Sequence, residues 1–209
     1  EEDFASEYRF MEESERARWM YGLYSAVSAQ TILPDGLYTG SLLTTRTPDV
    51  LLIIMESFGT SLMEYPDVAP NLNKLASEGV YFSNCYANSY RTDRGMVSLL
   101  SGQLSYPKLS LMKLPRESQS LPNLARTLSG AGYETSMLYG GDINFTNMKG
   151  YLRAGGYAHI TADTDFPLQE RTSSKWGVQD EHTFNYQLSI INCNAAANNS
   201  QFTIHNFGV

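Results

Sequence analysis

The chain has 209 residues, 42% of them hydrophobic, and a formal net charge of -7. This length and composition exclude disorder throughout and fit one domain with a small appendage. The 15 Lys and Arg against 22 Asp and Glu argue against a nucleic-acid partner, although an anionic substrate remains possible with a metal ion and a few arginines. No apolar run approaches the ~20 residues that span a bilayer, so the sequence as given predicts a soluble chain.

Residues 1–47 are predicted to form a helical lead-in segment. The pattern ends where Pro34 and Gly36 interrupt it. The apolar residues that follow a helical spacing are Phe4, Tyr8, Met11, Trp19, Met20 and Leu23. A lead-in of this kind precedes the main domain, which we expect to begin at residue 48.

The stretch "DVLLIIMESFG", residues 49–59, opens the main domain with a strand. A continuous apolar run such as residues 50–55 is typical of a parallel strand that is buried on both faces. Ligands of open α/β sheets bind beyond the carboxyl ends of such strands, and Glu56 stands at that position. The alternative is that Glu56 only opens a solvated turn.

Helices and strands are predicted to alternate along the rest of the domain. "NLNKLASEG" predicts a helix that ends at Gly79, and "VYFSNCYA", residues 80–87, predicts a second strand. "TDRGMVSLLSG" predicts a helix from Thr92, and "SLPNLARTLSGAGYETSMLYGG" predicts a helix capped by Ser120 and then a strand. This order predicts an α/β fold with a mainly parallel sheet and helices on both faces. Residues 48–192 form this domain, and residues 193–209 are set apart as an atypical tail with one possible strand, "QFTIHNF".

Glu56 and Thr92 are the first candidates for chemistry. Each ends a predicted parallel strand, so both should lie at one edge of the sheet. A threonine hydroxyl needs a metal ion or a base to become a nucleophile, and a carboxylate is a suitable hard oxygen ligand. A helix that begins after Thr92 adds backbone donors for a phosphate group. The alternative for Thr92 is an ordinary helix cap.

Four segments resemble the extracytoplasmic catalytic domain of lipoteichoic acid synthase-like phosphoglycerol transferases. Their sequence motifs are nearest to those of Gram-negative members. These segments are "DVLLIIMESFG", "APNLNKLASEGVYFSNCYANSYRTDRGMVSLLSG", "MLYGGDINFTNMKGYLRAGGY" and "KWGVQDEHTF". The transferases belong to the sulfatase/alkaline phosphatase superfamily. The resemblance covers residues 47–192 and implies the amino-terminal part of that fold, incomplete at its C-terminus. It also implies that Glu56 and Thr92 bind a divalent metal, usually Mn²⁺ with Mg²⁺, Zn²⁺ or Ca²⁺ as alternatives, and that Thr92 is the metal-bound nucleophile.

Two arginines flank the candidate nucleophile. Arg91 or Arg94 could neutralise a transferring phosphoryl group with paired donors, and a surface or ion-paired role is the alternative for each. Asp93 between them is expected to pair with an arginine or to favour the helix N-terminus rather than to bind metal.

The segment "YGGDINFTNMKG" supplies further candidates for substrate binding. Asp142, Asn144 and Asn147 should lie near the carboxyl edge of the sheet, with turn formation and capping as the alternative for the two asparagines. The Gram-positive synthases resemble F-W-N-R here, and this chain keeps only Phe145 and Asn147 of that motif. The head group is therefore expected to differ.

The segment "KWGVQDEHTF" matches the family where it leads into a helix. Trp176 is a candidate wall of the substrate cleft, with packing as the alternative, and Asp180 belongs to the same match.

Two related activities fit the sequence less well. Sulfatases use a formylglycine from a C-x-P-x-R context, whereas Cys85 stands in "CYANS" and is expected to be a buried structural residue of the second strand. Phosphoethanolamine transferases use a Cys-Gly-Thr setting with several disulfides, and this chain has only Cys85 and Cys193, far apart. Both activities are therefore disfavoured.

The resemblance also implies an Asp-His metal pair and substrate-binding histidines later in the chain. The candidates are His159, His182 and His205, and none follows an Asp. Structural roles are predicted for His159 and His182, whereas His205 is nearer in position to a family histidine.

Two hypotheses follow, and the histidines bear on both. One is a phosphotransferase acting on an anionic lipid or glycan phosphodiester at the periplasmic face of the inner membrane, within a protein anchored upstream of residue 1. The other is an inactive fragment or pseudo-enzyme that serves as a binding module. The 209 residues alone are expected to be inactive.

Overall fold

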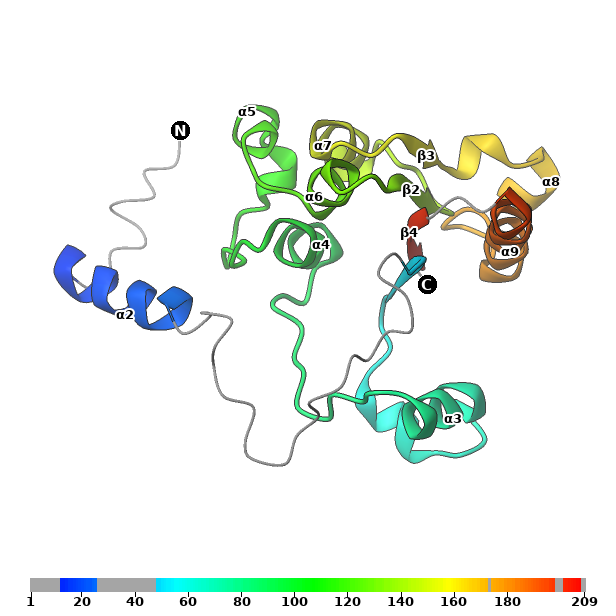
Figure 1. Ribbon diagram of the computed structural model, residues 1–209, viewed down its shortest axis with the longest axis horizontal. Coiled ribbons are helices and arrows are strands. Elements are labelled where there is room, and N and C mark those ends of the chain that lie inside the picture. Colours follow the sequence, from blue (N-terminus) through cyan, green and yellow to red (C-terminus); the bar gives the residue numbers. More distant parts are fainter. Residues whose placement is uncertain (1–11, 26–47, 173, 198–200, 208–209) are drawn as a thin grey trace. The chain divides into compact units, whose positions relative to one another are not determined.

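The structure is a computed structural model that describes residues 12–25, 48–172, 174–197 and 201–207 (Figure 1). The chain divides into two compact units, Glu1–Thr44 and Thr45–Val209. The described part of the first unit contains the helix α2 (Glu13–Ser25), and the other residues of the predicted lead-in lie outside the described residues. The second unit contains the sheet and the candidate site.

The second unit is built on a parallel sheet of four described strands. These strands are β1 (Val50–Met55), β2 (Glu134–Tyr139), β3 (His159–Thr161) and β4 (Gln201–Phe207), in the order β1-β4-β2-β3. The register pairs Met55 with Phe207 of β4, and Tyr139 with Asn206 of β4. The carboxyl ends of these strands therefore meet at one edge of the sheet. The predicted α/β class with a parallel sheet is confirmed.

Strand β4 comes from the segment that the sequence analysis set apart as a tail. It forms hydrogen-bonded ladders with both β1 and β2 and so lies inside the sheet. The boundary placed at residue 193 therefore does not follow the fold, because residues 201–207 connect the first strand to the rest of the sheet. The possible strand predicted for "QFTIHNF" is confirmed.

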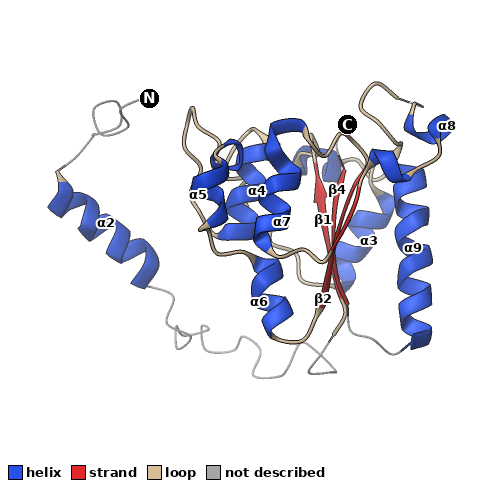
Figure 2. Cartoon of the chain, turned by 90° about the horizontal axis from the view of Figure 1, so that it is seen from above, coloured by secondary structure: helices blue, strands red, loops and turns tan. Residues whose placement is uncertain are grey.

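Helices cover both faces of the sheet, as Figure 2 shows. The helices α4 (Thr92–Ser101), α5 (Pro115–Gln119), α6 (Leu124–Gly130) and α7 (Met148–Gly155) lie on one side, and α9 (Asp180–Ala197) lies on the other. This unit contains further described helices. They are α3 (Pro70–Glu78), α8 (Leu168–Arg171) and the 3-10 helices η1 (Thr60–Glu64), η2 (Leu111–Lys113), η3 (Phe145–Asn147) and η4 (Asp163–Asp165).

The cap of α6 differs from the sequence prediction. Asn123 is the N-cap, and its side-chain oxygen accepts a hydrogen bond from the Ala125 N–H at 3.1 Å. The predicted cap, Ser120, instead ends α5 and donates its hydroxyl to the Glu117 carbonyl at 2.9 Å. The prediction failed because a short helix occupies the residues just before α6.

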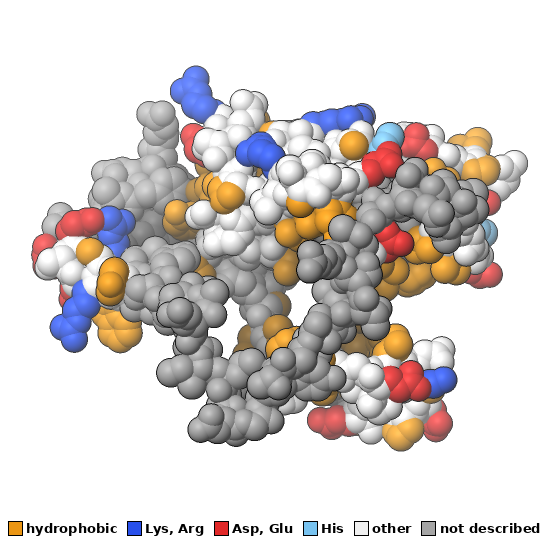
Figure 3. Space-filling model, in the orientation of Figure 1, with side chains coloured by type: hydrophobic (Ala, Val, Ile, Leu, Met, Phe, Trp, Pro, Cys, Tyr) orange, Lys and Arg blue, Asp and Glu red, His pale blue; other side chains and the backbone are white. Residues whose placement is uncertain are grey.

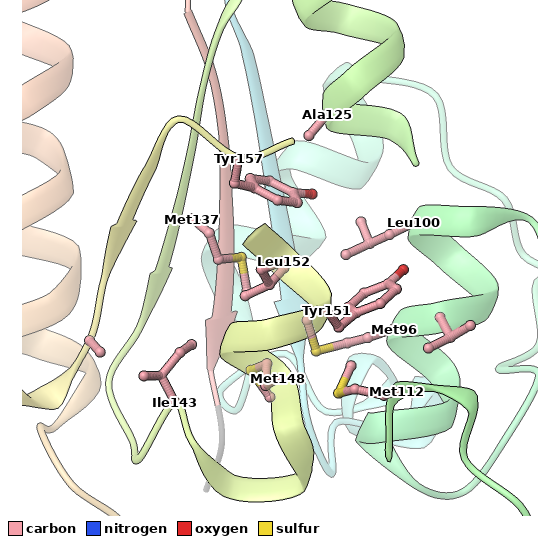
Figure 4. Packing of buried hydrophobic residues seen from close by; sticks show 12 residues of the cluster. Met96, Leu100, Met112, Ala125, Met137, Ile143, Met148, Tyr151, Leu152 and Tyr157 are labelled. Carbon is pink, nitrogen blue, oxygen red and sulfur yellow. The ribbon is translucent and has the colours of Figure 1, made fainter. Parts of the chain in front are cut away.

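The core lies between the sheet and the helices α4, α6 and α7 (Figure 4). Tyr151 of α7 is fully buried there, and its hydroxyl lies 2.6 Å from the Ser101 hydroxyl and accepts from the Asn123 amide at 3.3 Å. Burial raises the pKa of Tyr151 to about 12, so the phenol stays neutral. The network joins the end of α4, the cap of α6 and the middle of α7 behind the site.

The predicted second strand is wrong. The described residues 80–87 form no strand, and Val80, Tyr81 and Phe82 are exposed. Aromatic and β-branched residues favour strands only where a neighbouring strand offers ladder partners, and the described residues provide none here. Cys85 is accordingly an exposed free cysteine, which corrects the expectation of a buried one.

Strand β1 is buried on one face only, which also differs from the prediction. Leu52 and Ile54 pack against the core, whereas Leu51, Ile53 and Met55 are 45%, 41% and 43% exposed. Apolar side chains also reach the surface over α3 and α9 (Figure 3). The composition of β1 is that of a strand covered on both faces, and the described residues cover one of them.

Candidate active site

A cavity of about 610 Å³ opens at the carboxyl edge of the sheet. This volume falls in the range of sites that bind small molecules. Five segments line the cavity: the end of β1, residues 90–93 at the start of α4, the end of β2 with the turn after it, the region of η3, and the segment that leads into α9. The cavity thus lies where the sequence analysis predicted a site.

Glu56 lines the cavity directly after β1. The next residue, Ser57, has a φ of 55°, a left-handed conformation that is uncommon outside glycine. Such conformations are often found at functional sites, where the surrounding structure maintains the strain. The sharp turn at Ser57 ends the strand and leaves the Glu56 carboxylate at the sheet edge.

Thr92 lines the same cavity as the first residue of α4. The N-cap is Arg91, and no side chain caps the helix, so the alternative of an ordinary threonine cap is wrong. The first bonds of the helix are donated by Arg94 and Gly95 to the Arg91 carbonyl. The N–H groups that precede them have no intrahelical partner and can bind an anion.

Asp93 stabilises the start of α4 from inside the protein. It is only 5% exposed, and its carboxylate lies 3.4 Å from Lys113 Nζ and 3.8 Å from Arg91 Nε. The predicted pairing of Asp93 with an arginine is therefore observed. Arg91 lines the cavity and is held near Thr92 by this contact.

Arg94 does not line the cavity. Its guanidinium donates a hydrogen bond to the Pro107 carbonyl and lies 5.6 Å from the centroid of the Tyr90 ring. Both contacts are structural, because they fix the segments on either side of α4. The structure thus places Arg91 at the cavity, whereas the guanidinium of Arg94 is directed to the Pro107 carbonyl.

Of the three candidate site residues after β2, one lines the cavity and two do not. Asp142 lines the cavity, and its carboxylate accepts hydrogen bonds from the Asn144 N–H at 2.9 Å and the Asn144 amide at 3.2 Å. Asn147 adopts a φ of 62° and donates to the Met112 carbonyl at 2.8 Å. Neither asparagine lines the cavity. Asn144 makes the turn contact that the sequence analysis held as the alternative, whereas the Asn147 side chain caps no helix and binds a carbonyl 35 residues away in the sequence.

Trp176 forms part of the cavity wall and is 66% exposed. This placement agrees with the predicted cleft wall rather than with packing. Lys175 lines the cavity beside it, with its ammonium 5.4 Å from the centroid of the indole ring. Asp180 follows at the start of α9, where desolvation raises the pKa of its carboxyl group.

Tyr139 is a lining residue that sequence reasoning missed. It ends β2, and β4 separates it from the end of β1 by two strand spacings, about 10 Å. Burial, and then the charges of Glu56, Asp142 and Asp163, raise the pKa of its phenol. The hydroxyl is therefore a neutral donor at pH 7. Its position as the last residue before "GGD" was the available signal.

Glu56 and Thr92 bring a carboxylate and a hydroxyl oxygen into one cavity, and hard divalent ions prefer such donors. The donor chemistry of these two side chains therefore suits part of the coordination shell of such an ion. Within the described ranges no cluster of three or more His, Cys, Asp or Glu side chains could hold a metal.

The histidines of the described residues make structural contacts. His159 Nε2 lies 2.8 Å from a Glu134 carboxylate oxygen, and His182 Nδ1 lies 3.8 Å from Glu170. The backbone of His205 pairs with Ile53 and Leu138 inside the sheet, and its side chain lies outside the description. The contacts of His159 and His182 agree with the structural roles predicted for them.

The family model described as "Sulfatase" matches residues 48–206. The chain belongs to the sulfatase family. The match includes every lining residue of the cavity and all of β4 except its last residue, Phe207. Members of this family hydrolyse or transfer phosphate or sulfate esters and generally use divalent metals.

Two solved structures and one curated relative resemble this sulfatase-family chain. The lipoteichoic acid synthase LtaP from Listeria monocytogenes has a TM-score of 0.70 and 15% identity, over 78% of this chain and 40% of LtaP. A protein of the alkaline phosphatase superfamily from Vibrio parahaemolyticus has a TM-score of 0.73 and 23% identity, over 92% of this chain and 49% of that one. An N-acetylglucosamine-6-O-sulfatase from Bacteroides thetaiotaomicron is 26% identical over 105 residues, 45% of this chain and 18% of the relative.

The chain spans less than half the length of each of these proteins. The structural likeness supports the alkaline phosphatase-like fold. None of the helices in the described residues has the length and apolar content that crossing a bilayer requires.

Proposed function

We propose that this chain carries the nucleophile half of the active site of a metal-dependent phosphotransferase. Its substrates are phosphoglycerol-type phosphodiesters of cell-envelope lipid or glycan, and its location is the extracytoplasmic side of the membrane. The observation that carries the proposal is that Glu56 and Thr92 line one cavity, with Thr92 at the open N-terminus of α4.

The residues of the cavity support a two-step transfer. The Thr92 oxygen attacks phosphorus, the bond to the leaving oxygen breaks, and the leaving group departs with a proton. A hydroxyl of the acceptor then attacks the phosphothreonine and releases Thr92. Glu56 and Thr92 would hold a divalent ion, which would lower the pKa of the threonine hydroxyl when bound. Arg91 and the first N–H groups of α4 bind the phosphoryl oxygens.

A phosphate ester is preferred over a sulfate ester because of the residue that occupies the start of α4. A formylglycine forms from Cys or Ser, whereas this position holds Thr92. The free Cys85 lies outside the residues that line the cavity. The similarity to LtaP supports a phosphoglycerol substrate, and the similarity to the Bacteroides sulfatase makes sulfate ester cleavage the competing outcome.

The test compares the two ester classes with the full polypeptide that contains this sequence. A chromogenic phosphodiester and a phosphoglycerol lipid should be turned over in proportion to added Mn²⁺, whereas a chromogenic sulfate ester should not. Turnover of the sulfate ester alone would replace the proposal with a sulfatase. Absence of turnover of all three substrates would favour the inactive binding module.

Glu56→Gln should weaken Mn²⁺ binding by one to a few kcal/mol, roughly the loss of a charged contact. The amide keeps the shape of the side chain but removes the charge that attracts the ion. Isothermal titration calorimetry with Mn²⁺ measures the change. Glu117→Gln on α5 is the matched control, because this exposed carboxylate lies outside the cavity. Equal affinities of the two variants would show that Glu56 is not a ligand.

A further inference from the structure

Lys175 and Trp176 form a pair of exposed side chains on the wall of the cavity. The Lys175 ammonium lies 5.4 Å from the centroid of the indole ring, and both residues line the cavity. A cation–π contact at an exposed site contributes only about 0.5–1 kcal/mol, so a stronger anionic partner can displace the ammonium from the ring.

The ammonium of Lys175 has no acidic partner among the described residues. Arg91, the other cation among the lining residues, lies 3.8 Å from the buried Asp93. Lys175 makes no ion pair within the part of the chain that the structure describes, and its charge contact there is with Trp176. Of the two cationic side chains that line the cavity, Arg91 has an acidic neighbour and Lys175 has none among the described residues.

The backbone beneath this pair is held firmly. The Val178 N–H donates to the Gly140 carbonyl at 2.8 Å, which joins the segment to the end of β2. The Ser174 hydroxyl donates to the Gly177 carbonyl at 2.9 Å and accepts from the Trp176 N–H at 3.1 Å. These bonds fix the backbone that carries the two side chains before a ligand arrives, which lowers the backbone part of the ordering cost of binding.

We propose that Lys175 and Trp176 recognise the head group of the substrate, with the Lys175 ammonium on a phosphate oxygen and the Trp176 ring against the carbon skeleton. The inference rests on the proposed function and adds the residues that determine its specificity. The ligand class is a small polyol or sugar phosphate. Phe145, which also lines the cavity with an exposed ring, offers a second apolar surface for the same skeleton.

Binding can be followed through Trp176 itself. The chain has two tryptophans, so Trp19→Phe leaves Trp176 as the single indole. Titration with sn-glycerol 1-phosphate should change its fluorescence in a saturable way, because the phosphate removes the ammonium from the ring. Inorganic phosphate should act more weakly, and glycerol without phosphate should have no effect. Added salt should weaken the response.

Lys175→Met in this background should raise the dissociation constant for sn-glycerol 1-phosphate about tenfold or more. Lys74→Met is the matched control, since Lys74 makes only an exposed pair with Glu78 on α3 and should leave binding unchanged. In the full polypeptide, Lys175→Met should raise KM and leave kcat nearly unchanged, as expected for a lost binding contact. A purely structural role of Lys175 would not raise KM while leaving kcat unchanged.

The proposal is overturned if Lys175→Met and its parent titrate alike, if glycerol acts as well as its phosphate, or if no probe changes the fluorescence. Thr92→Ala separates this result from the proposed function, because it removes the nucleophile and leaves both recognition residues in place. The Thr92→Ala variant should therefore keep the fluorescence response and lose phosphotransfer. A fluorescence response of the parent chain, combined with no phosphotransfer by the full polypeptide with Thr92 intact, would uphold the head-group site and refute the transferase.

Discussion

Thr92→Ala should abolish phosphotransfer by the full polypeptide, with a loss on the order of 10⁴-fold or more, while its fold remains intact. The methyl group cannot form the bond to phosphorus, and Thr92 carries the one aliphatic hydroxyl among the described lining residues 90–93. The stability cost should stay below about 1 kcal/mol, because Thr92 does not cap the helix and makes no hydrogen bond through its side chain within the described residues.

Thr146→Ala is the matched control. Thr146 also lines the cavity, but its hydroxyl is directed to the Met112 sulfur at 3.6 Å. This variant should keep its turnover. Mass spectrometry of the enzyme quenched during turnover should find the phosphoryl group on Thr92, and a phosphoryl group trapped on any other residue would overturn the assignment.

Local sequence signals led to Glu56 and Thr92, and the structure places both at the cavity, while their roles stay predictions. Glu56 follows an apolar run, and Thr92 precedes a helical pattern, so both signals are local. The carboxyl end of a parallel strand explains the placement of Glu56. The strand predicted before Thr92 does not form in the described residues, and Thr92 reaches the cavity as the first residue of α4. The helix from Thr92 and the strand "YETSMLY" were also found from local signals, since hydrophobic periodicity sets them without reference to distant residues.

The failures share a physical cause, which is dependence on partners far along the chain. Residues 80–87 have a strand composition but no described strand beside them. Arg94 is near Thr92 in sequence, yet its guanidinium binds the Pro107 carbonyl. Asn147 looks like a polar residue at a sheet edge, yet its amide binds the Met112 carbonyl. No local pattern reveals these contacts.

Strand β4 shows the same limit on a larger scale. Its Asn/Ala-rich approach resembles a tail, and only the ladders to β1 and β2 reveal that it joins the two halves of the sheet. The sequence analysis did not identify Lys175 as a site residue. Lys175 reaches the cavity because its segment contacts the turn after β2, where Gly177 lies against Gly140. Disrupting this contact is predicted to cause a large loss of stability.

Gly177 approaches the end of β2 more closely than any side chain would allow. A Cβ atom at this position would lie 2.3 Å from the Gly140 carbonyl oxygen and 3.0 Å from the Gly141 Cα. The φ of Gly177 is 119°, a conformation that L-residues rarely adopt. Steric and conformational constraints therefore both require glycine here.

Gly177→Ala should lower the free energy of unfolding by roughly 2–5 kcal/mol, the sum of backbone strain and a steric clash. Relief of the clash requires the segment to move away from β2, which breaks the bond between the Val178 N–H and the Gly140 carbonyl. The Trp176 fluorescence response to sn-glycerol 1-phosphate should weaken with it. Urea denaturation and the fluorescence titration measure the two effects.

Gly132→Ala isolates the contribution of close approach. Gly132 has a φ of 92°, but a Cβ atom there would meet nothing within 4 Å. Its replacement should therefore cost only the backbone strain, about 1–3 kcal/mol, and should leave the fluorescence response intact, because Gly132 lies at the opposite end of β2 from the cavity. Equal losses of stability in the two variants, with the head-group response unchanged in both, would mean that the contact between Gly177 and Gly140 does not position the wall of the site.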